Sequence, residues 1–304
     1  MSEIVQALVV FFGLLVGAYV IAVVKRWIAF GPRYGTVLAL PGAEALVLLR
    51  QENLVTSASD RLLFRSAPLV AVAVVAMAAL VVPLGPGIIG FDPSIGLFYF
   101  IAVLSPFVIA MFCAGWSQNA KVGLFGAFRA TAYLIAYEVP LGFAAIGPVM
   151  HAESLSTMRI VEAQSDLWYA VWQPLGLIIY LVSAVAVSYA HPFDAPQSES
   201  ELGGGVLAEY SGARLLLFKV ALDALFVLLV AIAVVLFLGG GNGPLLAAPV
   251  WFVLKTCPLA AVTLWATRFV PRLRHDQLLT LSWKILLPAS LLNITVVGVL
   301  TLLL

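Results

Sequence analysis

Residues Leu215–Leu238 read LLLFKVALDALFVLLVAIAVVLFL, and this stretch decides the class of fold. Its only charged residues are Lys219 and Asp223. About 20 apolar residues in a helix are enough to cross the hydrocarbon core of a bilayer. Backbone groups in lipid must be hydrogen-bonded internally, so a spanning segment is either a helix or part of a closed barrel. Barrel strands are short and alternate in polarity. This long, continuous apolar run therefore predicts a transmembrane helix.

The composition extends this prediction to the whole chain. The 304 residues are 63% hydrophobic and 10% charged, with a mean hydropathy of +1.09. Soluble domains carry about 25% charged residues, which excludes an ordinary soluble fold. We expect an all-α membrane protein of about eight spans. The predicted spans are Ile4–Val24, Ala67–Leu84, Phe98–Ala114, Leu124–Val149, Trp168–Tyr189, Leu215–Leu238, Ala247–Arg268 and Ile285–Leu303.

The segments outside the spans are few. Gly42–Gln51 is apolar with a charged stripe, which is typical of a helix lying at the membrane surface. No internal repeat or linker interrupts the sequence, so we expect a single domain over residues 1–304. Cys113 and Cys257 lie in apolar runs without metal-ligand spacing. We expect them to be small buried residues, and we expect no metal site.

The basic residues predict the orientation, because cytoplasmic loops are rich in Lys and Arg. Four loops after odd-numbered spans hold nearly all of them, and the opposite loops hold only Arg159. This predicts that the four basic loops face the cytoplasm and that both termini face the outer side. The basic residues are Lys25, Arg26, Arg33, Arg50, Arg61 and Arg65, then Lys121 and Arg129, then Arg214 and Lys219, then Arg268, Arg272, Arg274 and Lys284.

Ionisable residues within spans indicate function, because their burial in lipid is costly. Glu138 lies about four turns into its helix and is followed by Pro140, which frees a backbone carbonyl. We interpret it as a group for reversible protonation, or else as a structural hydrogen-bonding partner of Tyr137 or a neighbouring helix. Lys219 and Asp223 share one helix face, as a neutralising pair or as a relay step. Lys255 has no partner nearby in sequence, so we expect a carboxylate from another helix.

The loop Pro192–Gly212 (PFDAPQSESELGGGVLAEYSG) is unusual because it is acidic on the predicted cytoplasmic side. Its proline, phenylalanine and glycine residues suggest an ordered loop that packs against something. The spacing of its carboxylates matches no metal-binding motif. A solvated acidic loop, partner docking and a path for protons all remain open. The carboxylates are Asp194, Glu199, Glu201 and Glu209.

Four segments, in order, resemble the H subunit of NADH-quinone oxidoreductase, respiratory complex I. Gly115–Arg129 (GWSQNAKVGLFGAFR), followed by Tyr137 and Glu138, is similar to that family's GWxSNxK stretch and its YE. Pro192–Gly212 resembles its PFD…EYSG loop, and Pro271–Lys284 (PRLRHDQLLTLSWK) resembles its PRxRxDQ…WK segment. Asp60 and Arg61 correspond to its DR pair. The chain departs from the pattern at Val187, Ala190, Gln197 and Leu222, and its segment after Lys25 is shortened.

The resemblance implies a heel subunit of the membrane arm that forms the quinone-access tunnel and the start of the acidic proton-coupling chain. It implies no catalytic residue and no metal ligand. The implied tunnel residues are Glu44, Arg129, Asp194, Arg272 and Arg274. The residues expected in proton coupling are Glu138, Glu199, Glu201, Glu209, Lys219, Asp223 and Lys255.

The implied activity is that of a non-autonomous subunit of a proton-translocating NAD(P)H or donor:quinone oxidoreductase in a bacterial-type cell membrane. Quinone would be the substrate, with flavin and iron–sulfur clusters only in partner subunits. The expected partners are the bilayer, other membrane-arm subunits and cytoplasmic iron–sulfur subunits, but no nucleic acid. The alternatives are the anchor subunit of a membrane-bound hydrogenase of the formate hydrogenlyase type, a stand-alone secondary transporter using Glu138 and Lys255, and a purely structural anchor. Transporters often show repeats and paired broken helices, and the sequence shows neither.

Overall fold

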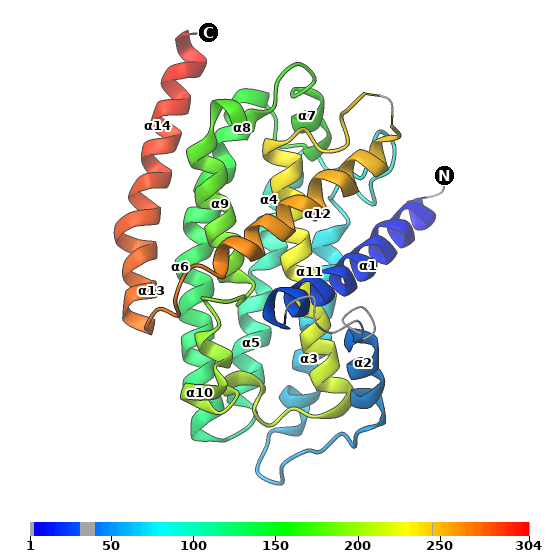
Figure 1. Cartoon of the computed structure of the whole chain (residues 1–304), viewed down its shortest axis with the longest axis vertical. Helices are drawn as coiled ribbons and strands as arrows, with labels where there is room; N and C mark the ends of the chain where they lie inside the picture. The colour runs from blue at the N-terminus through cyan, green and yellow to red at the C-terminus, as the bar shows by residue number, and fades with distance from the viewer. Residues whose placement is uncertain (1–2, 31–39, 245, 304) are drawn as a thin grey trace.

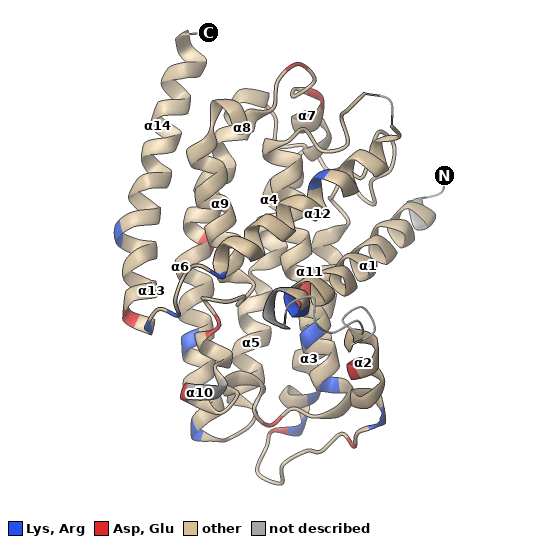
Figure 2. Cartoon of the chain, in the orientation of Figure 1, with Lys and Arg blue, Asp and Glu red and all other residues tan. Residues whose placement is uncertain are grey.

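The computed structural model describes residues 3–30, 40–244 and 246–303, and the side chains at 3–4, 28–30 and 199–200 lie outside that description. Its long helices run between two ends of a bundle (Figure 1). Within the described residues, seven helices are long and apolar enough to cross a membrane. The predicted all-α membrane fold is confirmed. Most Lys and Arg gather at the end that carries α2 and α10, which we call the basic end (Figure 2).

The bounds of the helices agree with most predicted spans. Five long helices correspond to the first, second, fourth, sixth and seventh spans: α1 (Glu3–Phe30), α3 (Arg61–Ala79), α6 (Lys121–Ala152), α11 (Gly212–Phe237) and α12 (Ala248–Thr267). The predicted surface segment is helix α2 (Leu40–Arg50). Short helices occupy the loops: α7 (Thr157–Glu162), η1 (Ala195–Gln197), α10 (Glu199–Leu202) and η2 (Gly205–Leu207).

Two predicted spans are divided where a proline begins the second piece. The third consists of α4 (Gly96–Leu104) and α5 (Pro106–Trp116). The fifth consists of α8 (Tyr169–Trp172) and α9 (Pro174–Val187). Proline has no N–H to donate and is tolerated at the first helical position, so each helix restarts there. At 1.5 Å per residue, the 14 residues of α9 extend about 21 Å, less than the roughly 30 Å hydrocarbon core. The fifth span is therefore shorter than expected.

The last span starts earlier than predicted. α13 (His275–Leu281), the π-helical turn η3 (Ser282–Leu286) and α14 (Leu287–Leu303) form one continuous helix. Lys284 was predicted to lie in a loop, but it lies within this helix. No proline or glycine interrupts residues 277–287. Pro288 cannot donate to the carbonyl of Lys284 four residues earlier, which accounts for the wider π-helical turn.

The first span ends later than predicted, so Lys25 and Arg26 lie in α1 rather than in a loop. α1 and α12 both pack against α11 and cross in front of it in Figure 1. Of the most apolar stretch of α11, 89% is buried. A helix that is apolar all round belongs in the interior of a bundle. The charges near the basic end of α11 must therefore find partners on the helices that surround it.

Candidate functional site

A pocket of about 190 Å³ lies between α1, α2 and α11. Each helix contributes a stripe of residues at helical spacing, so one face of each helix lines the pocket. The lining residues are Leu15, Ala18, Tyr19, Ala22 and Arg26 from α1, Pro41, Glu44, Ala45 and Leu48 from α2, and Leu216, Lys219, Val220 and Asp223 from α11. The pocket thus combines apolar walls with a group of charges.

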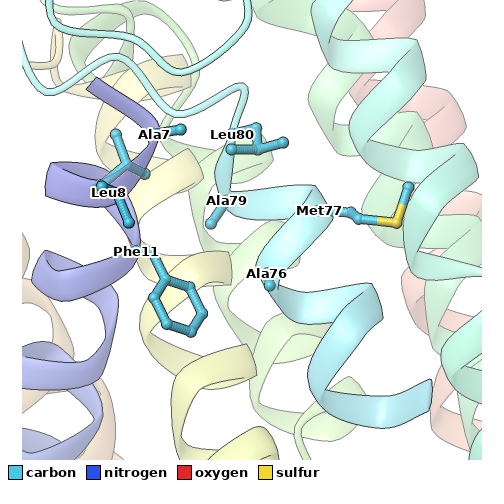
Figure 3. A pocket seen from close by; sticks show the side chains of 8 residues that line it. Ala7, Leu8, Phe11, Ala76, Met77, Ala79 and Leu80 are labelled. Atoms are coloured by element: carbon cyan, nitrogen blue, oxygen red, sulfur yellow. The ribbon is translucent and has the colours of Figure 1, made fainter. Parts of the chain in front are cut away.

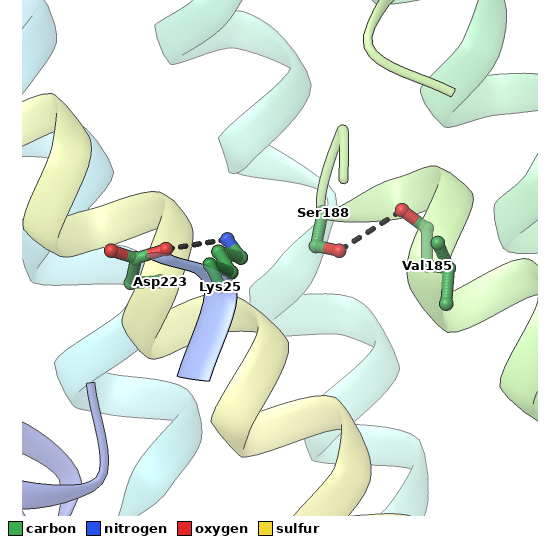
Figure 4. A network of polar contacts seen from close by, with 4 residues as sticks. All are labelled: Lys25, Val185, Ser188 and Asp223. Carbon is green, nitrogen blue, oxygen red and sulfur yellow. Dashed lines mark hydrogen bonds and ion pairs between the residues drawn. The ribbon is translucent and has the colours of Figure 1, made fainter. Parts of the chain in front are cut away.

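The charges of this pocket pair between helices. Glu44 accepts a hydrogen bond from Lys219 Nζ at 2.6 Å and forms an ion pair with Arg26. Lys25 Nζ lies 2.5 Å from Asp223 Oδ1 (Figure 4). Lys219 and Asp223 are therefore each bound to another helix, which the sequence left open. Ion pairs between partly exposed side chains such as these stabilise a fold only slightly.

Lys25 and Arg26 were not predicted as site residues. The sequence predicts a first span that ends at Val24, which would put both residues in a loop. The signal that could have identified Arg26 is its helical spacing from Tyr19 and Ala22, which continues the α1 stripe if the helix is extended by one turn. Arg33 lies outside the described residues.

The acidic loop is bound to the bundle by two ion pairs on the other side of the basic end, where α10 and α13 lie (Figure 1). Arg129 on α6 donates to Glu201 at 2.8 Å, and Arg272 donates to Asp194 at 2.8 Å. Of the expected tunnel residues, Arg129 and Arg272 therefore bind the acidic loop, to which Asp194 belongs. Glu44 lies apart from them, in the α1–α2–α11 pocket.

Three other expected residues are not brought into these pairs. Arg274 and Glu209 are exposed and form no ion pair with any described residue. The side chain of Glu199 lies outside the described part of the chain. Their assigned roles remain predictions.

The backbone of the acidic loop is closely packed, as its composition predicts. Gly205 has φ +53°, and a Cβ at this position would lie 1.9 Å from the carbonyl oxygen of Pro196. Gln118 donates from Nε2 to the carbonyl of Val206. The hydroxyl of Tyr210 donates to the carbonyl of Phe64 at 3.2 Å. Burial raises the pKa of Tyr210 to about 12, so this hydroxyl keeps its proton at neutral pH and remains a donor.

Glu138 lies half-buried in the middle of α6, and its Oε1 atom is buried without a hydrogen-bond partner among the described residues. The Tyr137 hydroxyl does not hold it, because that hydroxyl donates to the carbonyl of Leu278 at 2.7 Å. The hydroxyls of Tyr180 and Ser183 on α9 are likewise buried without a partner in the described part of the chain. Buried polar atoms are normally hydrogen-bonded to protein or to ordered water, so these groups are candidates for a hydrated path.

The register between α6 and α9 brings these polar groups to one level. Near one end of the pair, the Tyr189 hydroxyl donates to the carbonyl of Ala130 at 2.9 Å. Near the other end, Gln173 lies against Gly147. The two helices therefore run in opposite directions, and Glu138 lies level with the stretch of α9 that carries the two unpartnered hydroxyls.

Lys255 binds carbonyl oxygens rather than the expected carboxylate. Its ammonium donates to the carbonyls of Leu238 at 2.7 Å, Gly240 at 3.0 Å and Asn242 at 2.7 Å. These carbonyls follow the C-terminus of α11, where the helix dipole favours a cation. The ring centroid of Trp168 lies 4.9 Å from the ammonium, within cation–π range. Lys255 therefore closes the end of α11 opposite the pocket.

Lys255→Met is expected to lower the free energy of unfolding by about 3 kcal/mol, because hydrogen bonds to a charged group are strong and the three carbonyls would lose their donor. Thermal unfolding of the purified protein measures the loss. Leu254→Met is the control, since Leu254 is exposed on the same helix. Equal midpoints for the two variants would contradict this role for Lys255.

A second groove, of about 380 Å³, lies between α1 and α3 and is lined only by apolar side chains. Figure 3 shows the Phe11 ring extending from α1 towards Ala76 on α3. Without a polar group it offers no chemistry.

Cys257 is exposed on α12, so the prediction of two buried cysteines is wrong for that residue. Among the described residues, no group of three His, Cys, Asp or Glu side chains could hold a metal ion.

Comparison with known proteins identifies the family. A family model described as NADH dehydrogenase matches residues 4–298. The chain is 36% identical over 301 residues to NADH-quinone oxidoreductase H subunit 2 of Syntrophobacter fumaroxidans, covering 94% of this chain and 91% of the relative. This chain belongs to the H-subunit family of NADH-quinone oxidoreductase. It is also 37% identical over 273 residues to H subunit 2 of Rhizobium meliloti, covering 86% of this chain and 83% of the relative. With H subunit 1 of Rhodopseudomonas palustris the identity is 40% over 258 residues, covering 84% of this chain and 81% of the relative.

Membership in the H-subunit family fixes the general role of the chain. It is a multi-pass membrane subunit of an oxidoreductase complex that is a translocase. The family resemblance drawn from the four sequence segments is confirmed.

Proposed function

We propose that the α1–α2–α11 pocket is the mouth through which a quinone reaches the complex, and that Glu138 begins the path that couples quinone reduction to proton translocation. The observation that carries the proposal is the pocket itself, in which apolar stripes from three helices meet four charged side chains. A ligand pocket of this kind has mostly apolar walls and a few polar groups that orient the ligand.

The pocket suits a quinone because the molecule has two unlike parts. Its isoprenoid tail needs apolar contact, which Leu15, Ala18 and Leu48 supply. Its headgroup carbonyls accept hydrogen bonds, and Arg26 and Lys219 are the donors that line the same pocket. α2 would form one edge of the pocket entrance, which agrees with the prediction that this helix lies at the membrane surface.

The proposed proton path starts at Glu138, where a carboxylate shares a level of the bundle with unpartnered hydroxyls on α9. Water bound between Glu138, Tyr180 and Ser183 would supply the hydrogen bonds that these atoms lack. The other residues that we assign to the coupling chain are Glu199, Glu201 and Glu209 in the acidic loop, Asp223 and Lys219 beside the pocket, and Lys255. The residues that would brace the tunnel and its loops are Arg129, Asp194, Arg272 and Arg274.

We further propose that the whole chain is one domain whose basic end faces the cytoplasm, with both termini on the outer side. The distribution of Lys and Arg supports this orientation. Cytoplasmic iron–sulfur subunits would then dock on the basic end, beside the acidic loop, and other membrane-arm subunits would pack against the sides of the bundle. Flavin and iron–sulfur clusters would reside in those partners, with NADH or another compound as the electron donor.

Ala45→Phe tests the pocket because the larger side chain would fill space between α2 and α11. We expect the KM for a long-tailed quinone to rise by about tenfold, a loss of roughly 1.4 kcal/mol in binding, with electron transfer to a water-soluble artificial acceptor unchanged. The measurement is steady-state quinone reduction by the intact complex in membranes.

Val47→Phe is the matched control for this pocket test. It makes a similar enlargement at an exposed position of α2 that does not line the pocket. An unchanged KM in Ala45→Phe, or an equal change in both variants, would remove the pocket from the quinone path.

A further inference from the structure

Lys284 is exposed on the outward side of a membrane-spanning helix. It lies in the π-helical turn Ser282–Leu286, between α13 and α14. Its neighbours Trp283 and Ile285 are 48% and 57% exposed. A charged residue among exposed apolar side chains on a spanning helix requires an explanation, because ionisable groups in a bilayer normally face a partner or water.

Lys284 lies at the depth of the middle of α6 rather than at the end of the bundle. Two contacts align its helix with α6. Towards the start of α6, the Tyr133 and His275 ring centroids are 5.1 Å apart, and towards its end Gly147 lies against Asn293. The two helices therefore run in the same direction. Lys284 lies between these two contacts, about 14 Å along the helix axis from His275.

In the part of the chain that the structure describes, Lys284 has no carboxylate partner. No ion pair joins it to any described residue. The other face of this helix packs against the bundle, through Ser282, Leu286, Ser290, Asn293 and Val297. The face that carries Lys284 is open, and α14 lies at the edge of the molecule in Figure 1. Only 22% of the apolar window of this helix is buried.

The π-helical turn is a second observation at the same place. Such turns are rare and occur often at functional sites. Here Pro288 cannot supply the usual intrahelical donor for the carbonyl of Lys284, so the widened turn lies at Lys284 itself.

We propose that this face is the docking surface for a transmembrane helix of another membrane subunit, which places an Asp or Glu carboxylate against Lys284. This inference rests on membership in a multi-subunit complex and is independent of the proposed quinone pocket. A carboxylate fits because it neutralises the ammonium within the bilayer. A lipid phosphate is a poorer occupant, since headgroups lie at the membrane surface and Lys284 lies level with mid-bundle.

Crosslinking of the intact complex with dicyclohexylcarbodiimide in native membranes tests the proposal. This apolar reagent activates a carboxyl group, the Lys284 amine displaces the activating group, and an amide bond forms while the reagent leaves as its urea. Mass spectrometry is expected to find a Lys284 peptide joined to an Asp or Glu peptide of another membrane subunit. Lys284→Arg keeps the charge but forms no such amide, so it should keep the subunit and lose the crosslink.

Lys284→Met gives a second measurement. Removing the ammonium would leave a carboxylate unpaired in the interface, so we expect roughly tenfold less of the partner subunit to remain after detergent extraction. Leu302→Met, at an exposed position far along the same helix, should retain it.

Three results would overturn the docking surface. They are a Lys284 crosslink within this chain, a wild-type complex with no crosslink together with full subunit retention in Lys284→Met, and a Lys284→Met complex that keeps every subunit but loses bound anionic phospholipid.

Discussion

Replacing Glu138 by glutamine is expected to lower proton translocation by the assembled complex by about tenfold or more, because an amide of nearly the same shape cannot take up and release a proton. Glu138 Oε1 has no hydrogen-bond partner among the described residues, so the substitution breaks no protein contact at that atom. The effect should therefore fall on coupling rather than on folding.

The measurement for Glu138 is the proton gradient formed per quinone reduced in sealed vesicles. Glu138→Asp keeps an ionisable group and should restore part of the pumping. Glu162→Gln makes the same chemical change on α7, at an exposed position, and should leave pumping intact. If Glu138→Gln pumped and turned over at the wild-type rate, Glu138 would have no place in the coupling path.

Gly205→Ala is expected to disrupt the acidic loop, whereas Gly203→Ala should be tolerated. Both glycines have φ +53°, so an alanine at either position costs about 1–2 kcal/mol for the left-handed backbone. Only at Gly205 would the new Cβ meet an atom, the carbonyl oxygen of Pro196 at 1.9 Å, while at Gly203 nothing lies within 4 Å. Overpacking should add about 3 kcal/mol or more at Gly205.

Thermal unfolding and limited proteolysis of the acidic loop measure this difference. Because the two variants share the backbone strain, the gap between them isolates the contact with Pro196. We expect the Gly205→Ala loop to be cleaved faster and the electron transfer to quinone to fall with it. Equal stability of the two variants would show that the loop moves aside without cost.

The apolar pattern was sufficient to predict the membrane fold, since lipid allows only helices and closed barrels and the runs are too long and continuous for barrel strands. It was weaker at helix ends. A span that is ended at the first charged residue makes α1 too short, because long basic side chains can extend from a helix towards the interface. Lys25 and Arg26 are misplaced for this reason, whereas Lys284 lies well inside the continuous helix formed by α13, η3 and α14.

The partners of charged residues were beyond the reach of the sequence. Spacing along one helix suggested a pair between Lys219 and Asp223, but tertiary packing gave them Glu44 and Lys25. Lys255 was expected to meet a carboxylate, whereas the C-terminus of α11 supplied carbonyl dipoles. Distances between helices depend on how whole faces pack, and no local pattern encodes them.

The stiffness of α11 has a mechanical consequence. Residues 213–237 contain neither proline nor glycine, unlike α3, α6 and α12, each of which has proline inside. Helices kink mainly at such residues, so α11 is a strut about 39 Å long. Near one end, Lys219 and Asp223 form ion pairs with α2 and α1. At the other end, Lys255 of α12 donates hydrogen bonds to the carbonyls that follow α11. A displacement of α11 at Lys219 and Asp223 would therefore be carried along a helix without a hinge to the end that Lys255 holds.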